Sequence, residues 1–177
     1  GNGADMLVKR LLIDAGDKEL VHYEEARKLY RTEFDKDPFY KIQHYPGMPE
    51  TLKTLKQNGV KLGVCSNKPH EAAVKVVKRM FGDQVFDMVM GQSDSIRKKP
   101  APDGPLKIAE AFGVLPEECM YLGDSGTDMQ TGKAAGMYTV GVLWGYREKE
   151  ELLKNGADAL VESPEDILDL YEEKCSK

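Results

Sequence analysis

The sequence predicts an α/β protein with a parallel sheet flanked by helices, preceded by an all-helical segment. In residues 1–44 the apolar side chains recur only at helical spacing. From Tyr45 onward, short apolar runs alternate with helical segments. These runs are apolar throughout, as is typical of strands buried on both faces of a parallel sheet. We therefore expect a helical part at 1–44 and an α/β part at 45–177.

The helical part contains two expected helices, over residues 4–14 and 21–36. Gly16 is a plausible stop for the first helix. Asp37-Pro38 ends the second, because a residue that precedes proline is disfavoured in a helix.

The α/β part begins at the break Tyr45-Pro46-Gly47-Met48-Pro49, after which each predicted strand is followed by a helix. Ser163 is expected to cap the last helix, with Pro164 at its first position. Parallel sheets bind ligands outside the carboxyl ends of their strands, so the residues at those ends are the candidates for a site. We expect strands over residues 60–65, 86–90, 119–122, 139–143 and 157–161, and helices over 50–58, 71–80, 105–112, 129–136 and 148–154.

Composition excludes several classes of partner. The chain has 177 residues, 31% of them charged, and a net charge of −5. Its cations are spread along the sequence apart from Arg97-Lys98-Lys99, so no nucleic acid is expected as a partner. No stretch reaches the roughly 20 apolar residues of a membrane span, so no membrane partner is expected. There are three Cys without a CxxC pair, and no signal peptide is visible, which favours the reducing cytoplasm.

Polar side chains follow the predicted strands at their carboxyl ends. Ser66 and Asn67 follow one strand, Lys99 lies in a loop after the next, and Asp124 and Asp128 follow a third. This set suits a phosphate bound together with Mg²⁺. Ser66 can donate a hydrogen bond to a phosphoryl oxygen, and Lys99 can neutralise its charge. Asp124 and Asp128 can hold the metal.

Each of these residues also has a purely structural interpretation. Asp124 and Asp128 are typical caps of the helix that follows them, and Ser66 is a typical first residue of a helix. A lysine such as Lys99 in a charged loop is usually solvated. The arrangement of the whole set at neighbouring strand ends favours the phosphate and metal site.

Three motifs resemble those of a known family. Val64-Cys65-Ser66-Asn67-Lys68, Lys99-Pro100-Ala101-Pro102 and Gly123-Asp124-Ser125-Gly126-Thr127-Asp128 are similar to motifs II, III and IV of the haloacid dehalogenase (HAD) superfamily. The similarity is closest to its phosphoglycolate phosphatase branch. Leu143-Trp144-Gly145-Tyr146 also resembles that branch, and Gly1-Asn2-Gly3-Ala4 resembles a loop of its helical cap.

The resemblance implies a Rossmann-like core at 45–177 and part of a helical cap at 1–44. It implies an Mg²⁺-dependent phosphatase for a small phosphorylated metabolite similar to 2-phosphoglycolate, with pyrophosphate and a sugar phosphate as alternatives within the family. Either a monomer or a homodimer is expected. Ser66 would bind the phosphate with Asn67 beside it, and Lys99 would hold the nucleophile and the phosphate. Asp124 would ligate Mg²⁺ and Asp128 would support it.

One motif of the family has no match in the sequence. The family's nucleophile is the first Asp of an Asp-x-Asp-Gly-Thr motif on the central strand. Asp14-Ala15-Gly16-Asp17 and Asp35-Lys36-Asp37-Pro38 follow helical patterns, so neither qualifies. We expect this strand to lie in a segment before Gly1.

Two consequences of that absence are expected. Residues 1–177 alone should be inactive. They should also fold poorly, because the strands that carry Ser66 and Asp124 would lack their shared neighbour. The alternative is a non-catalytic HAD-like protein that binds phosphate or has a regulatory role.

Overall fold

The computed structural model describes residues 3–36, 39 and 42–175. It divides into two compact units, Gly1–Ile42 and Gln43–Lys177. The division lies close to the boundary expected between residues 44 and 45, and each unit is described by itself below. Among the described residues, no helix combines the length and the apolar character needed to cross a membrane.

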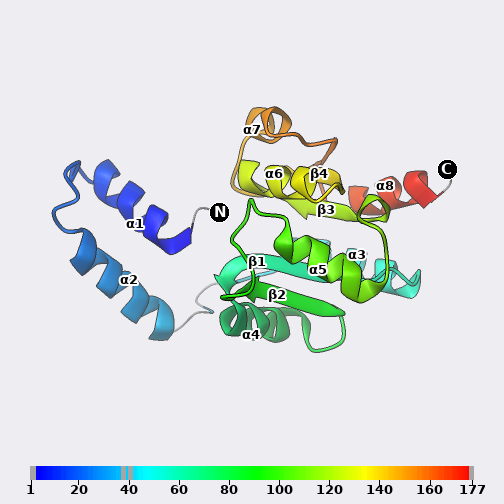
Figure 1. The fold of residues 1–177 in the computed structure, drawn as a ribbon, viewed down its shortest axis with the longest axis horizontal. Helices are drawn as coiled ribbons and strands as arrows, with labels where there is room; N and C mark the ends of the chain where they lie inside the picture. Colours follow the sequence, from blue (N-terminus) through cyan, green and yellow to red (C-terminus); the bar gives the residue numbers. More distant parts are fainter. Residues whose placement is uncertain (1–2, 37–38, 40–41, 176–177) are drawn as a thin grey trace. The chain divides into compact units, whose positions relative to one another are not determined.

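The first unit consists of two helices that pack together, α1 (Gly3–Asp14) and α2 (Tyr23–Lys36) (Figure 1). An ion pair joins them, in which Arg27 Nε donates to Asp5 Oδ1 at 3.0 Å. Val8 of α1 is buried, whereas Leu7 and Leu11 of the same helix are 45% and 56% exposed. Both helices lie where the sequence predicts them.

The second unit alternates helices and strands, so the predicted α/β class is confirmed. Most bounds differ from the prediction by a few residues. The strand that carries Ser66 differs most, because it continues to Pro69 rather than ending at Cys65. The elements are α3 (Met48–Gln57), β1 (Gly63–Pro69), α4 (His70–Phe81), β2 (Met88–Gln92), α5 (Asp103–Phe112), a 3₁₀ turn (Pro116–Glu118), β3 (Met120–Gly123), α6 (Gly126–Ala134), β4 (Tyr138–Val142), α7 (Lys149–Lys154), β5 (Ala159–Val161) and α8 (Asp166–Cys175).

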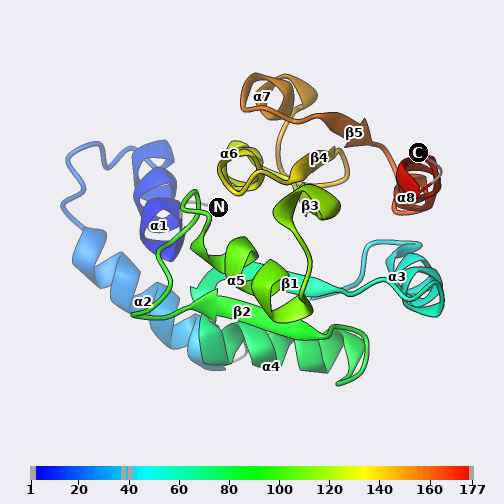
Figure 2. The same cartoon turned by 45° about the vertical axis from the view of Figure 1, so that its right-hand side comes forward.

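The strands of the second unit form two parallel sheets rather than the single sheet that was expected. One sheet has the order β1-β2 and the other β3-β4-β5 (Figure 2). Among the described residues, β1 and β3 therefore each pair with one strand only. This arrangement agrees with the expectation that the strands carrying Ser66 and Asp124 have no shared neighbour.

Two apolar clusters hold the second unit together. In the first, Leu52 of α3 packs with Val140 of β4 and Ile167 of α8. In the second, Tyr121 of β3 packs with Ala109 of α5, and Cys65 of β1 packs against them. Because residues of β1 and β3 meet in the second cluster, it joins the two sheets. Burial of one such large side chain stabilises the fold by about 1.5–3 kcal/mol.

Helices cover the sheets on several sides. Helices α4 and α5 lie on opposite faces of the β1–β2 pair, as both views show (Figures 1 and 2). Helix α6 packs against β3 and β4, and α3 packs against α8. These packed elements carry the predicted site residues. Ser66 and Asn67 lie in the last part of β1, Lys99 lies in the loop between β2 and α5, and Asp124 and Asp128 lie just after β3 and in the first turn of α6.

Candidate active site

Lys99 is the side chain that links the ends of the two sheets. Its Nζ donates to Asp128 Oδ1 at 2.7 Å and to the carbonyl oxygen of Cys65 at 3.2 Å. The side chains of Lys99 and Asp128 are only 15% and 9% exposed. An ion pair so shielded from water is weakly screened, and loss of either partner would leave a buried charge uncompensated. Lys99 is therefore not the solvated lysine of the structural interpretation.

The backbone of Lys99 is fixed by Asn67. Asn67 Oδ1 accepts the Lys99 N–H at 2.7 Å, and Asn67 Nδ2 donates to the Lys99 carbonyl at 3.3 Å. A side-chain amide satisfies both backbone groups of one residue in this way. The geometry gives Asn67 a positioning role toward Lys99, while its contact with phosphate stays a prediction.

A clasp between Arg97 and Asp103 closes the loop that carries Lys99. Arg97 Nη2 donates to Asp103 Oδ1 at 2.7 Å, and Arg97 Nε donates to Oδ2 at 2.9 Å. The backbone N–H of Arg97 donates to the same carboxylate at 3.2 Å. The hydrogen bonds from the Arg97 side chain lower the pKa of Asp103 to about 2. The clasp thus joins Arg97 to the first residue of α5, and Asn67 holds Lys99 between them.

Asp128 is held by the first turn of α6. Ser125 is the N-cap of this helix, and its hydroxyl accepts the Asp128 N–H at 3.3 Å and donates to Asp128 Oδ2 at 2.5 Å. A Cβ on Gly123 would lie 2.2 Å from the Asp128 Cβ, so the glycine permits this close approach. The capping interpretation is therefore right in part. Asp128 belongs to the capped turn, but the cap residue is Ser125 and not Asp124.

Asp124 lies between the end of β3 and the loop after β4. Its Oδ2 accepts the backbone N–H of Tyr146 at 3.2 Å. A Cβ on Gly145 would lie 2.2 Å from the Asp124 Cβ. Within the described part of the chain, Oδ1 of Asp124 has no hydrogen-bond partner. Of the two acids, Asp124 is thus the one that presents an unengaged oxygen.

Ser66 lies in the irregular end of β1, where the register with β2 shifts between Cys65 and Pro69. Its Oγ accepts the backbone N–H of Lys68 at 3.1 Å. Helix α4 begins at His70 with Pro69 as its N-cap, so Ser66 does not cap that helix. Because the hydroxyl acts as an acceptor in this turn, its hydrogen stays available to a phosphoryl oxygen.

The structure adds residues that the sequence argument did not place in the site. These are Ser125, the carbonyl of Cys65, and the pair Gly145 and Tyr146. The signal for the last pair was present, because Trp144-Gly145-Tyr146 follows a predicted strand at the sheet edge where ligands gather. Burial raises the pKa of the Cys65 thiol, so this side chain is not an activated nucleophile.

Magnesium fits this arrangement only with few protein ligands. In the parts of the chain that the structure describes, no three His, Cys, Asp or Glu side chains form a group that could hold a metal ion. Mg²⁺ commonly takes one or two carboxylates and completes its shell with waters and phosphate oxygens. Asp124 suits such a ligand, since one of its oxygens is held and the other is unengaged. Asp128, with its oxygens on Lys99 and Ser125, suits a supporting role.

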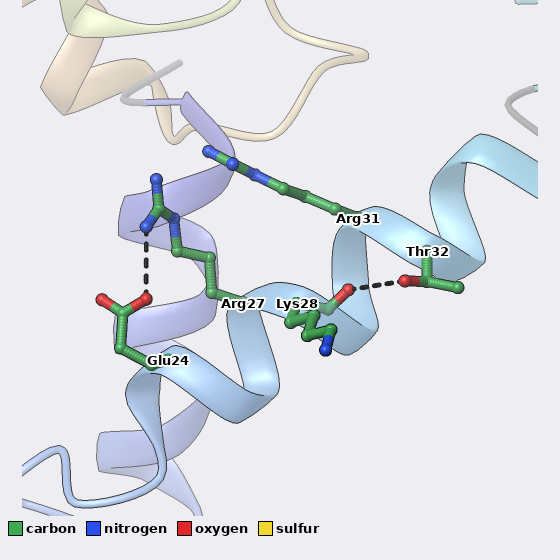
Figure 3. Close-up of a pocket in the computed structure, with 5 residues that line it drawn as sticks. All are labelled: Glu24, Arg27, Lys28, Arg31 and Thr32. Carbon is green, nitrogen blue, oxygen red and sulfur yellow. Dashed lines mark hydrogen bonds and ion pairs between the residues drawn. The ribbon is translucent and has the colours of Figure 1, made fainter.

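The first unit contains a cavity of its own, on helix α2. It has a volume of about 220 Å³ and is lined by Glu24, Arg27, Lys28, Arg31 and Thr32 (Figure 3). The Arg27 guanidinium turns toward Glu24, at 3.3 Å, while the side chains of Lys28 and Arg31 point in different directions (Figure 3). The predicted site residues do not line it, and Arg27 is already paired with Asp5 and Glu24 of the same unit.

Comparison with known proteins decides the family. Residues 1–142 match the family model of the haloacid dehalogenase-like hydrolases. The chain belongs to the haloacid dehalogenase-like hydrolase family. The resemblance drawn from the three motifs is confirmed at this level, and several similar proteins are named as phosphatases.

Three of these relatives are similar over nearly the whole chain. The phosphoglycolate phosphatase of Aquifex aeolicus (strain VF5) is 31% identical over 172 residues, which cover 97% of this chain and 76% of the relative. A crystal structure from Lactobacillus delbrueckii subsp. bulgaricus, provisionally assigned as a phosphoglycolate phosphatase, is 32% identical with a TM-score of 0.84, over 94% of this chain and 77% of that one. A predicted phosphoglycolate phosphatase from Haemophilus somnus is 26% identical with a TM-score of 0.83, over 97% and 78%.

Proposed function

We propose that this member of the family is an Mg²⁺-dependent phosphatase that hydrolyses a small phosphorylated metabolite similar to 2-phosphoglycolate. The observation that carries the proposal is the shielded Lys99–Asp128 ion pair at the carboxyl ends of β1 and β3. A lysine held in this way can neutralise negative charge on a transferring phosphoryl group. Asp124 follows β3 and Ser66 lies in the end of β1, so both are at the same edge as the lysine. The name of the Aquifex relative supports the class of substrate.

Each predicted site residue has a role in this proposal. The Lys99 ammonium neutralises charge on the phosphoryl group, and the Ser66 hydroxyl donates to one of its oxygens. Asn67 keeps the Lys99 backbone in place. Asp124 would ligate Mg²⁺ and Asp128 would support it through its hold on Lys99. When bound, Mg²⁺ would supply positive charge to the phosphate oxygens.

The nucleophile is proposed to be an Asp in a segment that precedes Gly1. Its carboxylate oxygen would bond to phosphorus as the substrate's alkoxide leaves and takes a proton. Water would then cleave the aspartyl-phosphate and release inorganic phosphate. The separation of β1 from β3 supports a strand from that segment as their shared neighbour, since each strand has a single ladder partner among the described residues. Residues 1–177 alone are then expected to be inactive.

The remaining expectations complete the proposal. Helices α1 and α2 would belong to a helical cap that excludes water and selects the leaving group. The partner would be the small metabolite, without nucleic acid or membrane, and the protein would act as a monomer or homodimer. The cysteines support a reducing cytoplasm, because Cys65 and Cys119 are free thiols.

Phosphate release from 2-phosphoglycolate in the presence of Mg²⁺ tests this function, using the protein with its preceding segment. Asp124→Asn and Lys99→Ala are each expected to lower the rate about 100-fold or more, since each removes charge stabilisation of the transition state. Lys133→Ala is a matched control, because Lys133 pairs with Asp158 at 2.8 Å and is 48% exposed.

Full activity in either site variant would refute the assignment. A protein that binds phosphate but releases none from any substrate would instead support the non-catalytic alternative.

A further inference from the structure

We infer that Trp144-Gly145-Tyr146, the loop after β4, is a positioning element that orients Asp124 toward a divalent cation. The inference rests on the proposed function, in which Asp124 is the Mg²⁺ ligand. The loop acts in two ways. Gly145 leaves space in which the carboxylate lies, and the backbone N–H of Tyr146 holds one of its oxygens.

The space at Gly145 is matched to the side chain of Asp124. A Cβ added at Gly145 would lie 2.2 Å from the Asp124 Cβ, 2.8 Å from its Cγ and 2.7 Å from Oδ2. Carbon atoms in contact normally lie about 3.5–4.0 Å apart, so all three distances are overlaps. The Asp124 Cβ is bonded to the backbone at the end of β3 and cannot turn away alone. Any larger residue at position 145 must therefore displace the acid or the loop.

The requirement for glycine here is one of space. Gly145 is absent from the glycines with a positive φ, which include Gly136 and Gly156 in the same region of the sequence. Alanine could adopt the backbone conformation of position 145, so its effect would come from the overlap with Asp124.

The hydrogen bond from Tyr146 decides which oxygen stays unengaged. The N–H reaches Asp124 Oδ2 at 3.2 Å, and a hydrogen bond to a charged carboxylate is stronger than one between neutral groups. The bond fixes the plane of the carboxylate and leaves Oδ1 for another ligand. Tyr146 acts through its backbone, because its side chain is 87% exposed.

The loop is itself anchored to the core by Trp144. This ring packs against the first apolar cluster and meets the ring of Tyr45 edge to face, with centroids 6.4 Å apart. The loop therefore has one residue in the core and the next two against Asp124. Such a construction holds a metal ligand more firmly than a solvated loop would.

Metal affinity provides a test that does not depend on activity. Trp144 is the only tryptophan among residues 1–177, so within this part of the protein tryptophan fluorescence reports from this loop. Mn²⁺ can replace Mg²⁺ as a paramagnetic probe, and its quenching of Trp144 in the full chain gives a dissociation constant. We expect saturable quenching in the wild type, and its loss in Asp124→Asn. We expect about tenfold weaker binding in Gly145→Ala, as for loss of an outer contact to a metal ligand.

Gly63→Ala is the matched control for the steric effect. Its new Cβ would lie 2.6 Å from the Ile108 Cγ2, at the start of β1. Both alanine variants are expected to lower the melting temperature, but only Gly145→Ala should weaken the quenching. If Gly145→Ala fails to fold, Tyr146→Pro removes the N–H donor and is expected to weaken binding about tenfold.

Two results would count against the inference in different ways. The first result is wild-type Mn²⁺ affinity in Gly145→Ala, together with loss of binding in Asp124→Asn. It would overturn the positioning role of the loop and leave Asp124 as the metal ligand. If Gly145→Ala is unfolded, Tyr146→Pro takes its place in this comparison. No Mn²⁺ binding by the wild type, or undiminished binding by Asp124→Asn, would overturn the proposed metal role of Asp124 and this inference with it.

Discussion

At the scale of single residues, the site is organised by a charge pair shielded from water. Lys99 and Asp128 lie 2.7 Å apart, and Ser125 and the Cys65 carbonyl complete the hydrogen bonds around them. The same pair fixes the Lys99 ammonium beside Asp128 and carries a desolvation cost. Its contribution to stability can therefore be measured separately from its proposed role toward phosphate.

Stability of the pair is tested by Lys99→Met. Removal of the ammonium leaves the Asp128 carboxylate buried without its partner, which is expected to lower the free energy of unfolding by about 3 kcal/mol. Lys99→Met with Asp128→Asn removes both charges and is expected to recover part of that loss. Urea denaturation of the three proteins measures the difference.

The more exposed ion pair of Lys133 and Asp158 serves as the comparison for the buried pair of Lys99 and Asp128. Lys133→Met breaks the pair with Asp158, in which Lys133 is 48% exposed, and is expected to change stability by about 1 kcal/mol or less. A double variant no more stable than Lys99→Met would contradict the account of a shielded, mutually dependent pair.

At the scale of elements, the loop between β2 and α5 is fixed by the clasp of Arg97 and Asp103. The pKa of Asp103 is about 2 in the folded protein, below its ordinary value of 3.8. A carboxylate with a lowered pKa favours folding at pH values above 3.8, and this contribution is lost as pH falls through about 2. Protonation in that window therefore releases one end of the loop that carries Lys99.

Carboxyl titration of Asp103 by NMR checks this assignment. Arg97→Gln removes the charged donor, so the pKa of Asp103 is expected to rise toward 3.8. The stability of this variant should fall less than that of the wild type between about pH 4 and pH 2. Arg147→Gln is a suitable control, because Arg147 pairs with Glu151 at a longer 3.7 Å. A wild-type Asp103 that titrates near 3.8 would disprove the clasp.

Most elements could be predicted from the sequence because their signals are local. Apolar runs of strand length and helical spacing between them gave the order of helices and strands. The irregular end of β1 could not be predicted, since it depends on pairing with β2. There, a Cβ on Gly91 would meet the Lys68 carbonyl at 2.7 Å.

The candidate site could also be predicted only in part. The residue types at strand ends indicated Ser66, Lys99 and Asp124, but they did not indicate the hydrogen-bond partners that fix these residues. Asn67 and Lys99 are 32 positions apart, and Asp124 and Tyr146 are 22 positions apart. Contacts over such separations depend on how two loops meet, which a local pattern does not encode.

At the scale of the whole molecule, the central feature is that β1 and β3 belong to different sheets. Each has one ladder partner among the described residues, although both carry residues of the candidate site. An apolar cluster that contains Tyr121 and contacts Cys65 joins the two sheets. The two sheets thus bring Ser66, Lys99 and Asp124 to the candidate site, and the proposed mechanism places the nucleophile in a segment before Gly1.

Identification of the phosphorylated residue tests that requirement most directly. The protein with its preceding segment would be mixed with substrate labelled in the phosphate, quenched in acid and mapped by mass spectrometry. We expect the label on an Asp that precedes Gly1, in an Asp-x-Asp-Gly-Thr sequence, and none within residues 1–177. A label on Asp124, Asp128 or another residue of this chain, or turnover without any phosphorylated protein, would contradict it.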